Sequence, residues 1–142
     1  MNKIAKEYYD KSEGVLQLSW ENVEEAARRI IEQMRADNFV PDIIISIARS
    51  GLIPAALISY VTGNKELYVI KIDFSKSQKI SHRQDLRDKP KISQELSKDI
   101  EGLKILVVDE MVVSGETLKM VSSYMTMKHP RAVKYCVLYK QP

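Results

Sequence analysis

Residues 105–117 read Ile105-Leu106-Val107-Val108-Asp109-Glu110-Met111-Val112-Val113-Ser114-Gly115-Glu116-Thr117. Four consecutive apolar residues predict a strand buried on both faces of a parallel sheet, because such strands lose the alternation of apolar and polar residues. The two acids that follow would lie at the carboxyl end of this strand, where open α/β sheets bind their ligands. The Ser-Gly-x-Thr turn would supply hydroxyl and backbone N–H groups at a helix N-terminus, which favours an anion. Acids for a metal or for sugar hydroxyls, beside a site for phosphate, indicate a phosphorylated sugar as the ligand.

The whole chain is predicted to be one soluble domain. It has 142 residues, of which 44% are hydrophobic and 29% charged, and its net charge of +3 suits an anionic substrate without requiring nucleic acid. The only cysteine, Cys136, excludes an internal disulfide and a Cys-rich zinc site, and we expect it to pack in a buried strand. No apolar leader and no run of 18 apolar residues is present, which predicts a cytoplasmic protein without a membrane segment.

Apolar periodicity predicts an α/β fold, a Rossmann-like parallel sheet flanked by helices, because strands and helices alternate along the chain. The expected strands cover 43–47, 67–72, 91–93, 105–108 and 132–139. The expected helices run from the N-cap Ser19 to about Asp37, from Leu52 to about Gly63, and from Thr117 towards Pro130. A cluster of methionines is expected in the core: Met111, Met120, Met125 and Met127. The glycines form neither a dinucleotide-binding nor a P-loop pattern, so both classes are disfavoured.

A second polar turn, Arg49-Ser50-Gly51, follows the strand at 43–47 and precedes another helix. Gly51 would permit either a close backbone approach or a positive φ. Residues 73–90 lack periodicity and carry five basic residues against three acids, which indicates a mobile basic loop over an anion site. Residues 1–14 are interpreted as an N-terminal extension of the single domain that spans 1–142.

On these residues the chain resembles the type I phosphoribosyltransferases. Residues 105–117 are similar to the motif with which that family binds phosphoribosyl pyrophosphate (PRPP). Three further segments, 18–20, 46–54 and 101–110, are similar to the xanthine/guanine/hypoxanthine branch, and the likeness spans about 15–140. The resemblance implies a glycosyltransferase of purine salvage. Such an enzyme would convert a nucleobase and PRPP to a nucleoside monophosphate and pyrophosphate with Mg2+. It would be a homo-oligomer, a dimer or tetramer, with no nucleic-acid partner.

The resemblance also implies a role for each motif residue. Asp109 and Glu110 would hold the ribose hydroxyls, directly or through solvent and metal, and would act in catalysis together with Arg83. The 5-phosphate would be wrapped by Val113, Ser114, Gly115, Glu116 and Thr117. Pyrophosphate would bind at Arg49, Ser50 and Gly51, in a loop where the family often has a non-proline cis peptide bond. Ser81 and His82 would lie with Arg83 in the catalytic lid, although His82 is equally well explained as a solvated loop histidine.

Two departures from the purine branch concern the base. Val113 stands where the 6-oxopurine enzymes typically have an aspartate that contacts N7, and valine can neither donate nor accept a proton. The sequence ends at residues 139–142, where those enzymes continue into a hood segment, so a reduced hood is expected. Adenine- and orotate-type relatives lack this aspartate too. Recognition of phosphate is unaffected by either departure, whereas the identity of the base is left open.

Two other functions are compatible with parts of the sequence. A non-catalytic sensor of PRPP or nucleotide, or an RNA-binding regulator, could use the same fold, but the basic loop has only Phe74 for base stacking. A flavodoxin-like phospho-receiver would use the acids at 109 and 110 for Mg2+, yet it leaves the turns at 49–51 and 114–117 without a joint purpose.

Overall fold

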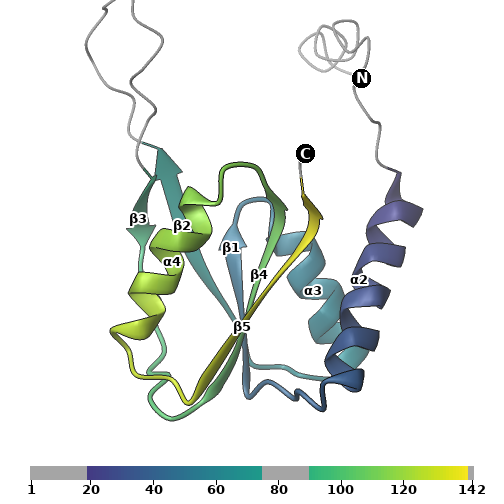
Figure 1. The fold of residues 1–142 in the computed structure, drawn as a ribbon, viewed down its shortest axis with the longest axis horizontal. Helices are drawn as coiled ribbons and strands as arrows, with labels where there is room; N and C mark the ends of the chain where they lie inside the picture. Colours follow the sequence, from purple (N-terminus) through teal and green to yellow (C-terminus); the bar gives the residue numbers. More distant parts are fainter. Residues whose placement is uncertain (1–18, 75–89, 141–142) are drawn as a thin grey trace, which may run out of the picture.

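The computed structural model describes residues 19–74 and 90–140. Their elements are α2 (Trp20–Ala36), β1 (Ile43–Ala48), α3 (Leu52–Thr62), β2 (Leu67–Phe74), β3 (Pro90–Gln94), β4 (Lys104–Val112), α4 (Glu116–Thr126) and β5 (Ala132–Lys140). The strands form one sheet in the order β3-β2-β1-β4-β5. Only the β2–β3 pair is antiparallel, and the other pairs are parallel. Helices α2 and α3 cover one face of the sheet and α4 covers the other (Figure 1). The predicted fold class is confirmed.

Helix α2 begins where the sequence predicts, at the N-cap Ser19. The Ser19 hydroxyl accepts from the Asn22 N–H at 3.3 Å, and the Asn22 side chain accepts from the Ser19 N–H at 3.0 Å. This reciprocal pair satisfies two backbone donors at the helix start. Residues at helical spacing, Ala27, Ile31 and Met34, are buried, so the helix presents an apolar stripe to the sheet.

Two apolar cores lie on opposite faces of the central strands, because successive side chains of a strand point to opposite faces. In β1, Ile43, Ile45 and Ile47 belong to the core under α4, whereas Ile44 belongs to the core under α2 and α3. In β4, Ile105 and Val107 pack on the α4 side, and Leu106 and Val108 pack on the opposite side. Both central strands are therefore covered on both faces, as their continuous apolar runs predict.

Three strand or helix ends differ from the predicted ones by two residues or more. β4 continues through the two acids to Val112, and β2 continues through Asp73 to Phe74. α4 ends at Thr126, with Met127 as its C-cap, which is short of Pro130. The methionines were predicted to form part of the core, and this is wrong for two of them: Met125 is fully buried, but Met111 and Met127 are exposed. Within residues 19–74 and 90–140, no helix has the length and hydropathy needed to cross a membrane.

Candidate active site

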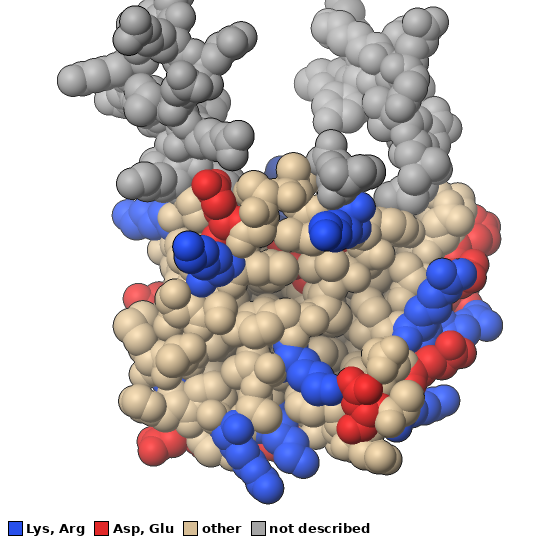
Figure 2. Space-filling view, viewed as in Figure 1, with Lys and Arg blue, Asp and Glu red and all other residues tan. Residues whose placement is uncertain are grey.

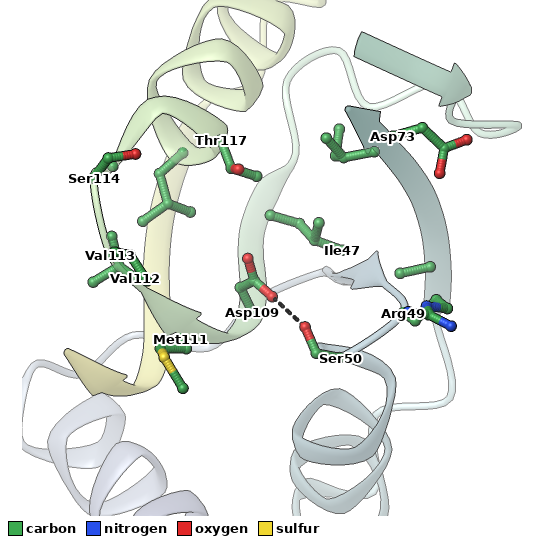
Figure 3. A pocket seen from close by; sticks show the side chains of 14 residues that line it. Ile47, Arg49, Ser50, Asp73, Asp109, Met111, Val112, Val113, Ser114 and Thr117 are labelled. Atoms are coloured by element: carbon green, nitrogen blue, oxygen red, sulfur yellow. Dashed lines mark hydrogen bonds between the residues drawn. The ribbon is translucent and has the colours of Figure 1, made fainter. Parts of the chain in front are cut away.

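A cavity of about 720 Å³ opens at the carboxyl ends of β1, β2 and β4 (Figure 3). It is lined by Ile47, Ala48, Arg49, Ser50, Ile72, Asp73, Asp109, Met111, Val112, Val113, Ser114, Gly115, Thr117 and Leu118. The polar residues come from three strand ends and from the loops that precede α3 and α4. This is the edge at which an open parallel sheet binds ligands, as the sequence predicts.

Asp109 lies at the base of this cavity and is only 7% exposed. One of its carboxylate oxygens accepts from the Ser50 hydroxyl at 3.3 Å and from the Glu110 N–H at 2.8 Å (Figure 3). Burial raises the pKa of Asp109 above its ordinary value, the two hydrogen bonds oppose this shift, and the charge of Glu110 adds to it. A carboxylate held this way is oriented by the protein, and both hydrogen bonds go to the same oxygen, Oδ1.

Glu110 does not line the same cavity, although the sequence pattern suggested that the two acids act together. Because β4 continues through both residues, their side chains point to opposite faces of the sheet. Glu110 instead borders a depression of about 270 Å³ with Ser19, Trp20, Val23, Ser50, Ile53, Pro54 and Leu138. Ser50 lines both hollows.

The Arg49–Gly51 loop lies on the opposite wall from the Ser114 loop (Figure 3). The peptide bond between Ala48 and Arg49 is cis, which places the expected non-proline cis bond at the start of this loop. A Cβ atom on Gly51 would lie 2.5 Å from the Val108 carbonyl oxygen and 2.7 Å from that of Ile47. Gly51 has a φ of −66°, so close backbone approach, and not positive φ, explains the glycine.

The Ser114–Thr117 loop forms the N-terminus of α4. Gly115 is its N-cap with a φ of +80°, a conformation that glycine adopts without strain, and the Glu116 N–H donates to the Ser114 hydroxyl at 3.4 Å. Ser114, Gly115 and Thr117 line the cavity, whereas Glu116 does not. Backbone N–H groups in the first turn of a helix have no intrahelical partner, so this loop can receive an anion. Val113 is 65% exposed and lines the cavity beside them.

Asp73, at the end of β2, lines the cavity but was not among the predicted site residues. Its carboxylate lies 3.1 Å from the Lys71 ammonium. A hydrogen bond from Ser93, the Lys71 ammonium and the charge of Arg49 lower the pKa of Asp73. The sequence contains one signal for it: Asp73 directly follows the apolar run 67–72 that predicts a strand, although the loss of periodicity places it in the predicted loop 73–90.

The remaining predicted site residues, Ser81, His82 and Arg83, lie outside the described residues. Within the two described ranges, no group of three or more His, Cys, Asp or Glu side chains could hold a metal ion by itself.

An open α/β sheet with two helix N-termini at its strand ends has the arrangement in which such sheets bind phosphorylated ligands. The model of the phosphoribosyl transferase domain family matches residues 18–142. The chain therefore belongs to the phosphoribosyltransferase family, whose enzymes are glycosyltransferases that transfer a pentosyl group. This membership decides against the phospho-receiver.

Individual relatives agree with the family match. The xanthine-guanine phosphoribosyltransferase of Idiomarina loihiensis is 29% identical over 126 residues, which are 88% of this chain and 70% of that protein. A 47-residue match to the hypoxanthine-guanine phosphoribosyltransferase of Aquifex aeolicus is 43% identical and covers 33% of this chain and 26% of that protein. The solved purine phosphoribosyltransferase from Pyrococcus horikoshii superposes with a TM-score of 0.75 at 29% identity, covering 89% of this chain and 78% of that one.

Proposed function

We propose that this protein is a PRPP-dependent nucleobase phosphoribosyltransferase whose acceptor is a purine. It would convert a base and PRPP to a nucleoside monophosphate and pyrophosphate. The observation that carries the proposal is the convergence of two anion-receiving loops and Asp109 on one cavity of about 720 Å³. The relatives named above act on purines according to their names, which supports a purine as the acceptor.

The two loops match the two ends of PRPP. The backbone N–H groups of Ser114–Thr117 and the Ser114 and Thr117 hydroxyls would bind the 5-phosphate, with Val113 beside them; the Glu116 side chain, which lies outside the cavity lining, would take no part. On the opposite wall, Arg49–Gly51 would bind the pyrophosphate, because a guanidinium and a helix N-terminus both favour phosphate. Asp109 lies between the two loops, where its free oxygen can accept from a ribose hydroxyl.

The reaction needs little covalent chemistry from the protein. The bond between C1 and the pyrophosphate oxygen breaks with its electrons leaving on pyrophosphate. A ring nitrogen of the base then donates a lone pair to C1 and loses its proton. Catalysis is therefore mainly positioning of the ribose and stabilisation of the leaving charge. Asp109 would orient the ring through its hydroxyls, and Arg49 would receive the charge that develops on pyrophosphate.

A magnesium ion fits the residues that line the cavity. Mg2+ is usually bound by one or two carboxylates together with substrate phosphates and water, and the cavity offers Asp109 and Asp73. We propose that these two, more than Glu110, face the metal, because the Glu110 side chain borders the other depression. When bound, the metal supplies charge neutralisation to the pyrophosphate. Asp109 would then serve both the metal and the ribose.

Release of pyrophosphate tests the proposal directly. The purified protein with Mg2+ and PRPP is offered hypoxanthine, guanine, xanthine, adenine and orotate in turn, and turnover is expected with at least one purine. Asp109→Asn and Thr117→Ala should each lower kcat/KM by roughly a hundredfold or more, as loss of one preorganised polar contact does. Ser123→Ala on the exposed side of α4 is the matched control and should leave kcat/KM unchanged.

Two outcomes would contradict the proposal in different ways. Binding of PRPP without pyrophosphate release from any base would instead support the non-catalytic sensor. Normal PRPP binding in both Asp109→Asn and Thr117→Ala would show that the cavity is not the site. Val113→Asp adds a test of the acceptor: it should raise kcat/KM for 6-oxopurines, since it restores a hydrogen-bonding side chain beside the base.

A further inference from the structure

The Ser50 hydroxyl points at Asp109, although Ser50 lies in the loop before α3 and Asp109 lies in β4. It donates to the Oδ1 atom of Asp109 at 3.3 Å, and this hydrogen bond joins residues 59 positions apart. The two side chains face each other at the base of the cavity (Figure 3). Within residues 19–74 and 90–140, no other side chain hydrogen-bonds to Asp109. Ser50 is therefore the one side chain of the described residues that can orient this carboxylate.

The backbone around Ser50 is packed against the backbone of Asp109. The next residue, Gly51, has no room for a side chain, because an added Cβ atom would lie 2.5 Å from the Val108 carbonyl oxygen and 3.1 Å from the Asp109 Cα atom. The Gly51 N–H also donates to the Ile47 carbonyl at 3.0 Å, which ties the loop to β1. Ser50 thus has little freedom to move relative to Asp109. A side chain held by such packing is suited to fix a neighbouring group in one geometry.

The hydrogen bond from Ser50 decides how the Asp109 carboxylate is turned. The torsion that rotates a carboxylate is broad, so one donor alone leaves its direction poorly defined. Oδ1 receives a second hydrogen bond from the Glu110 N–H at 2.8 Å, and the other oxygen, Oδ2, points away from Ser50 (Figure 3). Asp109 is buried, so few water molecules can compete with these two donors. Together the donors hold Oδ2 in one direction on the cavity side. Figure 2 shows, for comparison, that the charged side chains of this protein are otherwise mostly at its surface.

The Ser50 hydroxyl cannot donate to Asp109 and to a phosphate at the same time. A serine hydroxyl carries one proton, so while it donates to the carboxylate it has none for a phosphate oxygen. The Arg49 guanidinium of the same loop has several N–H donors and suits phosphate without this hydroxyl. The loop therefore has two tasks: Arg49 suits the pyrophosphate, whereas the Ser50 side chain serves the carboxylate.

We propose that Ser50 is a positioning residue for the ribose: its hydroxyl turns the Asp109 carboxylate so that Oδ2 meets a ribose hydroxyl. The side chain then acts through Asp109 and not by contact with pyrophosphate. Because Ser50 belongs to the loop that would bind pyrophosphate, this one hydrogen bond also joins the two ends of the substrate site. The inference rests on the proposed function, which places the ribose at Asp109.

Ribose 5-phosphate and pyrophosphate separate the two tasks of the loop. Each is titrated alone by calorimetry, without Mg2+, so that no metal brings Asp109 into contact with pyrophosphate. Ser50→Ala should raise the Kd for ribose 5-phosphate about tenfold, within the range of couplings measured between hydrogen-bonded residues, and should leave the Kd for pyrophosphate unchanged. In an Asp109→Ala background, Ser50→Ala should have no further effect on ribose 5-phosphate. Binding stays measurable there because the Ser114–Thr117 loop still holds the phosphate.

Two further variants show that the effect belongs to the hydroxyl and its partner. Ser50→Thr keeps the hydroxyl, and Ser50 is exposed, so this variant should bind ribose 5-phosphate nearly as tightly as wild type does. Ser114→Ala is the matched control, since it removes a serine hydroxyl from the other loop of the same cavity. Its cost should be the same with and without Asp109→Ala, because Ser114 would meet the phosphate and not the carboxylate.

The possible results distinguish this inference from the proposed function. No loss for ribose 5-phosphate in Ser50→Ala, or an equal or larger loss for pyrophosphate, would overturn the inference. So would a loss that persists unchanged in the Asp109→Ala background. Each of these results leaves the proposed function standing, because wild type still binds both ligands. A wild-type chain that does not bind ribose 5-phosphate would contradict the proposed function as well as this inference.

Discussion

At the scale of single residues, Asp109 shows the cost of building a site. It is a carboxylate with 7% exposure, and burial raises its pKa. Its hydrogen bonds from Ser50 and from the Glu110 N–H recover part of the lost hydration. Burial thus works against the charged form of Asp109, and a carboxyl group whose pKa is shifted by burial in a cavity is typical of a binding site.

Asp109→Asn should therefore make the free protein more stable at pH 7, by about 1 kcal/mol, while it abolishes PRPP binding. The pKa of Asp109 is raised in the folded state, so its contribution favours folding below the unfolded pKa of about 3.9 and is lost as the pH rises through the folded pKa. The advantage of asparagine should be largest at neutral pH and should shrink on acidification. Urea unfolding at several pH values measures it, and a less stable variant at pH 7 would contradict this account.

Cys136 was predicted to pack in a buried strand and to have no role in a site. It is the only cysteine of the chain, and burial, together with the charge of Asp109, raises the pKa of its thiol to about 12. The thiolate is the reactive form of cysteine, so at physiological pH this side chain stays protonated. It packs against the core under α2 and α3, which agrees with the expected packing role.

At the scale of elements, Gly51 is required by the close packing of α3 against the ends of β1 and β4. Gly51→Ala should destabilise the protein by about 1–3 kcal/mol, because backbone oxygens lie where the new methyl group would be and the strands that carry them cannot move freely. Its φ of −66° costs nothing for alanine, so the whole effect comes from this close approach of α3 to β4.

Gly102→Ala is the control for Gly51→Ala. Gly102 has a φ of +72° with nothing within 4 Å of the added atom, so its substitution measures backbone strain alone, about 1 kcal/mol. Urea unfolding of both variants compares the two costs. If Gly51→Ala were as stable as wild type, the approach of α3 to β4 would be looser than described. Gly51→Ala should also weaken PRPP binding, which Gly102→Ala should not.

The elements also show why the sequence predicted the fold better than the site. Long apolar runs such as 43–47 and 105–108 identify buried strands, and the rule that ligands bind at strand ends then brings Arg49, Ser50 and Asp109 together. The same rule could not place Glu110. Two adjacent acids after an apolar run look like the end of a strand, but β4 continues through them to Val112. Side chains alternate between the two faces of the sheet only as far as the strand continues. The position of the strand end therefore decides on which side a residue such as Glu110 lies.

Asp73 was missed for the related reason that β2 loses its apolar pattern before it ends. Lys71 and Asp73 interrupt the run, but pairing with β3 keeps the backbone extended through Phe74. That pairing joins residues on either side of the segment 75–89, so it depends on a contact that no local pattern contains. Strand ends formed by such pairing are set by tertiary structure, and side chains on them are hard to assign from sequence.

At the scale of the whole molecule, the cavity lies between parts that pack on opposite faces of the sheet. Arg49–Gly51 precedes α3 on one face, and Ser114–Thr117 precedes α4 on the other, with Asp109 between them. A ligand with phosphate at both ends of a ribose would bridge the two loops and connect both apolar layers through one molecule. The proposed substrate should therefore stabilise the entire domain against unfolding.

Thermal unfolding with Mg2+ and PRPP measures this bridging. At a PRPP concentration about a hundred times Kd, the free energy of unfolding should rise by about 2.7 kcal/mol, and Tm by roughly 5–10 °C for a domain of this size. At the same concentration, ribose 5-phosphate or pyrophosphate alone reaches only one loop, should bind more weakly, and should therefore give smaller shifts. Asp109→Asn should start from a higher Tm and gain little from PRPP. A shift as large with pyrophosphate alone as with PRPP would mean that the two loops do not share one ligand, and the Ser114–Thr117 loop would need another role.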